Sequence, residues 1–422
     1  MFVAISNTPR DYAWGSATAI AELLGTAPSG RPEAELWLGA HPGSPARVVG
    51  APPATGGAAD LAEWTATDPA AALGGLPRLP FLLKVLAAEG PLSLQAHPDA
   101  ARAAAGFAAE NALGIPLDAP ERNYRDPYPK PEIIVALSER FVALCGFRPV
   151  EEARAVFLAL GLDELLPRLA SLPSLVGWLL ADGPEVDALV ARVTDRAAER
   201  PTAERTTAER PTAERTASGV RTNLKEIGPD TDQNRTEVVE SGPSSFVLDA
   251  LETVRTLANA FPGDAGILTA LLLNRVTLAR GEALYLPAGN IHAYLNGLGI
   301  ELMTASDNVL RGGLTGKHVD VDELLAVLDF TPTAVPYLEP QVLPGLALYR
   351  PDDAGFALAH VTADARLALT GPAIALCTAG SFALAGGVAS ATVARGDALY
   401  VTPDEGALAV TGAGDLFVAT TA

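Results

Sequence analysis

The chain has 422 residues and a formal net charge of −20, so it is long enough for two or three domains and too acidic for a partner with a phosphate backbone, such as nucleic acid. Its two cysteines, Cys145 and Cys377, are too few and too far apart for a disulfide framework or a thiolate metal site, which fits a reduced, cytoplasmic setting. The N-terminus has no basic segment followed by an apolar core, and no stretch reaches the roughly 18 apolar residues of a membrane span, so we expect a soluble protein without a membrane partner.

The first part of the chain predicts short strands separated by Gly and Pro, in YAWG (Tyr12–Gly15) and AELWLGAHPGSPA (Ala34–Ala46). His41 lies in the second piece, beside Pro42. A histidine there can be a metal ligand, but no carboxylate stands at ligand spacing from it. We therefore predict a turn or hydrogen-bonded histidine and leave His41 out of the site.

Two strand-like runs follow in PFLLKVLAAEGPLSLQAHPD, joined at Glu89-Gly90-Pro91. Lys84 interrupts the first run, where either an outward solvated charge or an inward phosphate contact fits. Ser93, Gln95 and His97 stand at i, i+2 and i+4 in the second run, so one strand face carries a hydroxyl, an amide and an imidazole.

A helix is predicted over Ala100–Ala112 from its alanine content, and a strand over Ile133–Leu137. Pro129 and Pro131 keep the backbone extended around Lys130. Lys130 and Glu132 are again two residues apart, and their side chains can face one cavity.

Residues 149–195 show apolar recurrence at every third or fourth position, which predicts helices. The next segment, Ala198–Thr216, is a pentad repeat built on Ala-Glu-Arg, followed by a polar stretch. Because it has little apolar surface to bury, we predict a disordered insertion at about 198–242, with a long charged helix as the alternative. Helical structure should resume at Ser244–Ala260.

The densest chemistry lies in GEALYLPAGNIHAYLNGLGIELMTASDNVLRGGLTGK, from Gly281 to Lys317. His292 and Tyr294 should share one face of a strand there. The spacing resembles the second motif of the cupin superfamily, which implies a jelly roll with an interior, metal-binding histidine. Five residues match that motif: Gly281, Pro287, Gly289, His292 and Asn296.

The chain after Pro332 alternates apolar runs with turn residues, as an all-β domain does. Its segment ARGDALYVTP (Ala394–Pro403) repeats ARGEALYLP (Ala279–Pro287), which indicates two copies of one β unit. The second copy has no equivalent histidine, so it is predicted to be a structural domain without metal.

Four polar residues on predicted strand faces can converge in a jelly roll and offer two imidazole nitrogens and two oxygens: Gln95, His97, Glu132 and His292. Such a set suits zinc with one open position, although manganese, iron or nickel are alternatives.

The motifs QAHPD, KPE, HAYLNG and SDNVLRGGLT, with YAWG and AELWLGAHP near the start, together resemble the type I phosphomannose isomerase family, the zinc-dependent mannose-6-phosphate isomerases. The resemblance implies a mainly β fold with an inserted α domain, that is, two cupin-like jelly rolls plus a helical domain. The implied divisions are a catalytic cupin domain of residues 1–148 and 263–330, a helical domain of residues 149–262 and a degenerate cupin-like domain of residues 331–422.

The same resemblance implies one zinc ion per chain, held by the four residues above, and a sugar-phosphate substrate. Arg311 would match the family's catalytic arginine. The residues implied around the substrate are Lys130, Tyr294, Glu301 and Asp307, and the candidate phosphate or substrate contacts are Ser93, Lys84 and Lys317.

One departure from the family stands at Pro129, where its members commonly carry a histidine before KPE. The general base therefore stays open between Lys130, Glu301 and Asp307, with His318 as a substitute for the missing imidazole. The alternatives are a cupin that binds sugar phosphates without catalysis and a metal-dependent oxygenase, which the glutamine ligand and the cations disfavour. We expect a monomer.

Overall fold

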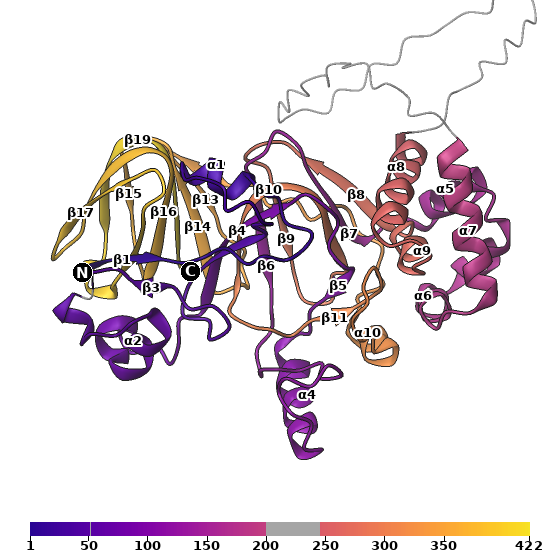
Figure 1. Cartoon of the computed structure of the whole chain (residues 1–422), viewed down its shortest axis with the longest axis horizontal. Helices are drawn as coiled ribbons and strands as arrows, with labels where there is room; N and C mark the ends of the chain where they lie inside the picture. The colour runs from indigo at the N-terminus through magenta and orange to yellow at the C-terminus, as the bar shows by residue number, and fades with distance from the viewer. Residues whose placement is uncertain (51, 200–244) are drawn as a thin grey trace, which may run out of the picture.

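The computed structural model describes residues 1–50, 52–199 and 245–422. Two antiparallel sheets and a group of helices lie side by side along the long axis (Figure 1). The prediction of a mainly β fold with an inserted helical region is confirmed. The predicted insertion at about 198–242 lies outside the described residues, apart from its first two positions.

The nine-stranded sheet is organised around its longest strand, β10 (His292–Thr304), which pairs with β4, β5, β6 and β7. Gly297 lets this strand bend, because its φ is 131° and a Cβ there would lie 2.7 Å from the Phe141 ring. The other strands of the sheet are β2 (Glu35–Leu38), β4 (Phe81–Ala88), β5 (Gln95–Ala96), β6 (Glu132–Ala136), β7 (Phe141–Phe147), β8 (Leu273–Leu278), β9 (Ala283–Leu286) and β11 (Leu310–Arg311).

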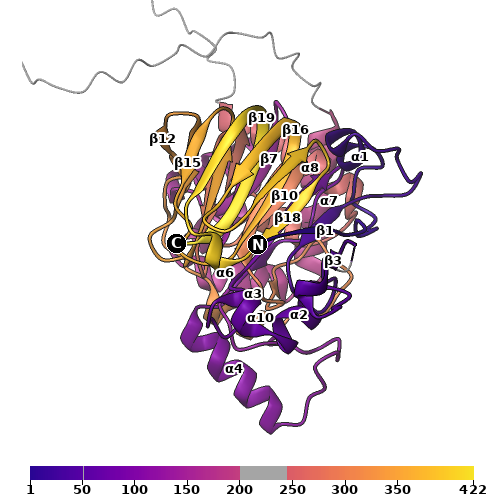
Figure 2. The ribbon, with the colours of Figure 1, turned by 90° about the vertical axis from the view of Figure 1, so that its left-hand side faces the viewer.

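The ten-stranded sheet contains the C-terminal strands and also two strands from the start of the chain, β1 (Phe2–Ser6) and β3 (Arg47–Val48) (Figure 2). Strand β1 pairs with β18, with Phe2 opposite Val401, and buries Val3 and Ile5 against Tyr400. The structure thus differs from the predicted division, which assigned residues 1–148 to the metal-binding unit. The remaining strands are β12 (Gln341–Leu343), β13 (Leu346–Tyr349), β14 (Phe356–Val361), β15 (Ala365–Leu367), β16 (Ala373–Ala385), β17 (Ser390–Ala394), β18 (Ala398–Val401) and β19 (Leu408–Thr421).

The repeated segment forms the same turn in both sheets. Gly281 and Gly396 both have positive φ, 85° and 93°. The acid that follows each glycine accepts a hydrogen bond from a backbone N–H three residues earlier, 2.8 Å for Glu282 and 2.9 Å for Asp397. Each turn leads into a buried strand, β9 or β18, so the sequence repeat corresponds to a structural one.

The helical region packs its apolar side chains, such as Leu175, Val193 and Leu257, into one core that also covers an end of the nine-stranded sheet. Its helices are α5 (Val150–Leu160), η2 (Asp163–Ala170), α6 (Leu172–Leu180), α7 (Pro184–Glu199), α8 (Ser245–Ala260) and α9 (Gly266–Ala270). The helices elsewhere are α1 (Ala19–Leu24), η1 (Pro53–Thr55), α2 (Leu61–Thr67), α3 (Pro69–Leu73), α4 (Ala100–Ala112), α10 (Val321–Val327) and η3 (Pro403–Glu405).

Helix α4 has the predicted bounds, and Asp99 caps it by accepting a hydrogen bond from the Arg102 N–H at 2.7 Å. Both cysteines are buried free thiols in different sheets. Of the helices in the described ranges, none has the length and apolar character needed to cross a membrane.

Candidate metal centre and substrate cavity

Three strand starts bring the predicted metal ligands together. His292 opens β10 and pairs directly with Gln95 of β5, while His97 follows β5 by one residue. Glu132 opens β6, the neighbour of the far half of β10. The bend in β10 allows residues from both of its halves to meet at one point.

Glu132 lies between the two histidines. Its Oε1 is 3.2 Å from His97 Nε2 and its Oε2 is 3.3 Å from His292 Nε2. One ligand atom from each of the three residues lies within 4.8 Å of the others, and all three side chains are buried. Burial alone would raise the pKa of Glu132, but the charge of Lys130, together with the contacts of the two imidazoles, holds it well below its usual range.

Backbone carbonyls orient both imidazoles. His97 Nδ1 is 2.7 Å from the carbonyl oxygen of Asn308, and His292 Nδ1 is 3.0 Å from that of Asn290. Each Nδ1 must therefore carry the proton, which leaves each Nε2 as an electron-pair donor. Burial, with the nearby Lys130 charge, lowers the pKa of His97 to about 4, so this ring is neutral near pH 7.

This donor set fits a divalent metal. Glu132 Oε2 is buried and accepts no hydrogen bond among the described residues. The Gln95 amide nitrogen lies 3.2 Å from His292 Nε2, and rotation of that amide presents its oxygen to the same point. Two imidazoles, a carboxylate and an amide oxygen suit zinc or a similar ion.

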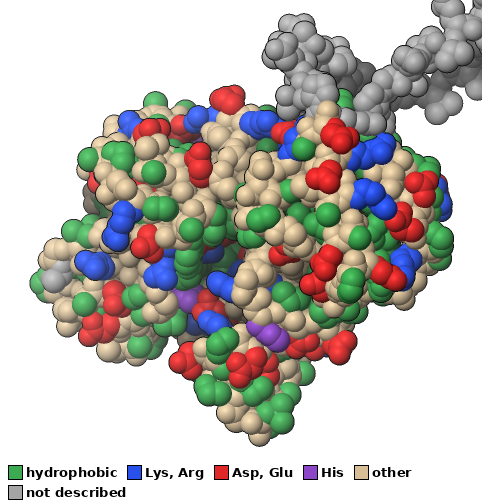
Figure 3. Space-filling model, turned by 45° about the vertical axis from the view of Figure 1, so that its right-hand side comes forward, with side chains coloured by type: hydrophobic (Ala, Val, Ile, Leu, Met, Phe, Trp, Pro, Cys, Tyr) green, Lys and Arg blue, Asp and Glu red, His purple; other side chains and the backbone are tan. Residues whose placement is uncertain are grey.

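A cavity of about 410 Å³ opens beside this cluster. On the face shown in Figure 3, blue Lys and Arg side chains and purple His side chains gather around a hollow. Seven residues predicted for the site line the cavity: Lys84, Ser93, Gln95, Lys130, Asp307, Arg311 and Lys317. His318, considered as a substitute acid or base, is exposed and is not among the lining residues.

Two cations that line the cavity, Arg311 and Lys317, lie near a third, Arg125, which lines the neighbouring cavity. Burial and the charge of Arg125 lower the pKa of Arg311. Burial lowers the pKa of Lys317 as well, and the charges of Arg311 and Arg125 add to this effect. Within residues 1–50, 52–199 and 245–422, none of the three forms an ion pair with a carboxylate at 4.0 Å or less. Such a cluster favours an anionic ligand, and Arg125 was missed in the sequence because it stands in an irregular loop.

Lys84 is buried, so the outward solvated alternative for it is wrong. Its Nζ lies 2.8 Å from Glu301 Oε2 and 3.6 Å from Glu35 Oε1. Burial alone would lower the pKa of Lys84, but these two carboxylates raise it above its usual value. The charge of Lys84 is therefore balanced within the protein.

Tyr294 and Glu301 lie behind the cavity wall rather than on it. The Tyr294 ring packs edge-on against Phe141, with centroids 5.4 Å apart. Burial, followed by the negative charges of Glu301 and Glu132, raises the pKa of Tyr294 well above its ordinary value. Both residues support the site from the interior of the sheet.

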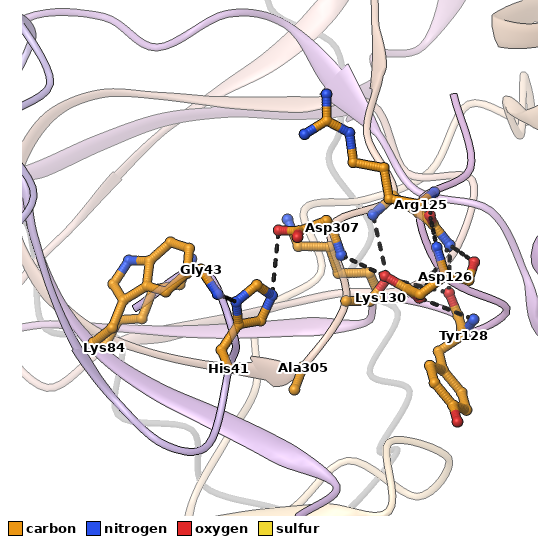
Figure 4. Close-up of polar contacts among 12 residues, drawn as sticks. His41, Gly43, Lys84, Arg125, Asp126, Tyr128, Lys130, Ala305 and Asp307 are labelled. Atoms are coloured by element: carbon orange, nitrogen blue, oxygen red, sulfur yellow. Dashed lines mark hydrogen bonds and ion pairs between the residues drawn. The ribbon is translucent and has the colours of Figure 1, made fainter. Parts of the chain in front are cut away.

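His41 is buried and lines the cavity, although the sequence analysis left it out of the site. Its Nε2 lies 3.3 Å from Asp307 Oδ1 (Figure 4). The missing carboxylate partner was thus present far along the chain.

The fold and the site together define a mainly β protein with a buried candidate metal centre beside a cavity lined by Lys and Arg side chains. The family model described as phosphomannose isomerase type I, catalytic domain, matches residues 2–150. The mannose-6-phosphate isomerases of Shigella flexneri and Escherichia coli (strain K12) are each 35% identical to this chain, and each match covers 97% of this chain and 97% of the relative. The chain therefore belongs to the type I phosphomannose isomerase family.

Solved structures agree with this assignment. The crystal structure of a zinc-bound mannose 6-phosphate isomerase superposes with a TM-score of 0.80 at 29% identity, covering 100% of this chain and 99% of that chain. The apo form from Salmonella typhimurium gives a TM-score of 0.79 at the same identity and coverage.

Proposed function

We propose that the chain is a zinc-dependent isomerase that interconverts mannose 6-phosphate and fructose 6-phosphate through a cis-enediol. The observation that carries this proposal is the buried His97, Glu132 and His292 cluster beside a cavity lined by unbalanced cations. The relatives reported above are mannose-6-phosphate isomerases, which supports this substrate, and one solved relative holds zinc.

The four residues that would hold zinc are Gln95, His97, Glu132 and His292. Bound zinc supplies Lewis acidity toward the sugar oxygens at C1 and C2. The rest of the chemistry falls to the chain. Arg311, which stays protonated, would stabilise the negative charge that develops on the enediolate.

At the other end of the substrate, Lys317, Ser93 and Arg125 are the groups we assign to the phosphate. Lys317 and Arg125 have no carboxylate to balance them among the described residues, and Ser93 can donate a hydroxyl hydrogen bond. Lys84 is already balanced by Glu301 and Glu35, so we place it against a sugar hydroxyl.

Asp307 is our choice for the base that moves the proton between C2 and C1. Burial would raise its pKa, but the hydrogen bond with His41, together with the charges of Lys130 and Arg125, lowers it, so the carboxylate is ionised near pH 7. Lys130 also lines the cavity and is held by Glu132 at 2.9 Å. Glu301 and Tyr294 lie behind the wall and are less suited to proton transfer.

Chelation provides the direct test. Purified protein should convert mannose 6-phosphate to fructose 6-phosphate, lose this activity when the metal is removed, and regain it when zinc is returned. Folded, zinc-loaded protein that converts no substrate would instead favour a sugar-phosphate-binding protein without catalysis. A cytoplasmic, monomeric state without nucleic-acid or membrane partners remains a prediction.

Asn308 should set zinc affinity without touching zinc. Its backbone carbonyl accepts the His97 proton, while its side-chain Nδ2 donates to the carbonyl oxygens of Asp126 and Tyr128 at 2.7 and 2.9 Å. Asn308→Ala should raise the zinc Kd about 10–100-fold, measured by competition with a chromophoric chelator. Asn123→Ala is the control, because the Asn123 amide donates a hydrogen bond to Asp320 rather than to a group that orients a proposed zinc ligand. Equal Kd values for the two variants would contradict this role.

A further inference from the structure

His41 and Asp307 form a pair in the wall between two cavities. The two residues line both the substrate cavity of about 410 Å³ and a neighbouring cavity of about 300 Å³. Only 5% of His41 is exposed, whereas the Asp307 side chain remains 45% exposed. Asp307 is therefore held from one side and open to the cavity on another.

The surroundings of the His41 ring fix its tautomer. The Gly43 N–H donates to His41 Nδ1 at 3.1 Å, so Nδ1 is unprotonated and the ring proton sits on Nε2. That proton is directed at Asp307 Oδ1, 3.3 Å away. Trp37 packs edge-on against the ring, with centroids 5.0 Å apart, and restricts its rotation. Figure 4 shows the chain of contacts from Gly43 through His41 to Asp307.

The backbone of Asp307 is anchored as firmly as its side chain. Its N–H donates to Asp126 Oδ2 at 2.8 Å, and the Ser306 hydroxyl donates to the other oxygen of Asp126 at 2.8 Å. Within the described ranges, His41 is the one side chain that pairs with the Asp307 carboxylate at 4.0 Å or less. The direction of that carboxylate thus depends on His41.

His41 is poorly suited to accept the substrate proton itself. Its Nδ1 is occupied by the Gly43 N–H, and its Nε2 already carries a proton. Protonation at Nδ1 would break the Gly43 hydrogen bond. Asp307, by contrast, has two oxygens and only one hydrogen-bonding side chain, so it retains a free electron pair for the cavity.

We infer that His41 is a positioning residue that donates a hydrogen bond from Nε2 to the Asp307 carboxylate and so aims it at the substrate, and this inference rests on the proposed isomerase function. Asp307 would take the proton from C2 of the open-chain aldose to give the enediolate, the O2 hydroxyl proton would pass to O1, and Asp307 would return its proton to C1 to give the ketose. No proton is gained or lost over the cycle, and the His41 proton stays on Nε2. This arrangement provides a fixed base that does not depend on an imidazole at the position of Pro129.

The charges around Asp307 come from several elements. Ten charged or titratable groups line its two cavities: Tyr12, His41, Arg78, Lys84, Arg125, Asp126, Tyr128, Lys130, Arg311 and Lys317. Burial favours the neutral acid, whereas His41, Lys130 and Arg125 lower the pKa of Asp307. Loss of the His41 contribution should therefore raise that pKa. Because the carboxylate is the active form, the acid limb of the kcat/KM profile should move to higher pH.

The experiment compares His41→Phe and His41→Gln in zinc-saturated protein, with zinc content measured at each pH. Phenylalanine keeps the contact with Trp37 but has no donor, so kcat should fall about 10–100-fold with KM unchanged. The acid limb should move up by about one pH unit. Glutamine can place an amide N–H near the position of Nε2, so it should recover part of both changes, and it also serves if the phenylalanine variant does not fold.

His360→Phe is the matched control, because His360 pairs with Asp415 at 2.7 Å in the other sheet and should leave kcat and the acid limb unchanged. An acid limb that stays at the wild-type pH in both His41 variants would overturn the inference, even if kcat falls, since packing alone would then explain the loss. Inactive wild-type protein would instead refute the proposed function, so the two failures are distinguishable.

Discussion

Arg311→Ala should lower kcat about 10²–10³-fold while the zinc content stays that of the wild type. Arg311 lies directly opposite Gln95 in the β5–β11 pair, so the backbone ladder fixes the guanidinium beside the metal centre. It lines the cavity and has no carboxylate partner among the described residues. Its charge is therefore available for the enediolate, and alanine removes it without disturbing a ligand.

Two further variants, Arg311→Lys and Arg366→Ala, test whether the loss of kcat is specific to the guanidinium of Arg311. Lysine keeps the charge but not the planar fork of donors, so it should recover only part of kcat. Arg366 is an exposed arginine on β15 of the other sheet, and its loss should have no effect on kcat. If Arg311→Ala loses zinc in proportion to activity, the arginine is a structural support of the centre and its assigned role is wrong.

Part of the candidate metal centre could be predicted because the spacing that relates its residues is local. Gln95 and His97 stand two residues apart, and His292 lies in a motif with fixed spacing. Strand alternation then settles which side chains share a face. Only the approach of Glu132 to His292 needed the tertiary structure, because β10 pairs with β5 near one end and with β6 near the other.

Lys84 shows where such local reasoning ends. Strand alternation predicts which other residues of β4 share a face with Lys84. Whether that face is buried or exposed depends on the residues of the neighbouring strands. Glu301 of β10 and Trp37 of β2 both stand directly opposite Lys84. These partners are far away in the sequence, so burial and charge balance at Lys84 could not be predicted from its own segment.

The partner of His41 and the pairing of β1 could not be predicted from the sequence for the same reason. The partner of His41 is Asp307, and β1 joins β18 near the other end of the chain. No spacing rule connects such positions. Arg125 is a different case, because its loop has no regular structure and its place is set by hydrogen bonds to Asn308, including the Arg125 N–H to Asn308 Oδ1 at 2.8 Å.

Glu132→Gln should abolish zinc binding, and kcat should fall about 10³-fold or more with it, since a bound metal contributes several kcal/mol to such a reaction. Glutamine matches the size of glutamate, but it lacks the negative charge that lies between the two imidazoles. It also leaves Lys130 buried without its carboxylate, which should destabilise the protein by about 3–5 kcal/mol. Metal analysis and denaturant unfolding measure the two effects separately.

Glu301→Gln separates loss of a ligand from loss of a buried ion pair. Glu301 is as buried as Glu132 and also holds a lysine, Lys84, at 2.8 Å. Its replacement should therefore destabilise the protein while zinc stays bound. If both variants lose zinc, general loosening of the sheet is the cause. If Glu132→Gln keeps zinc with wild-type affinity, Glu132 is not a ligand. The ion must then be bound by other residues.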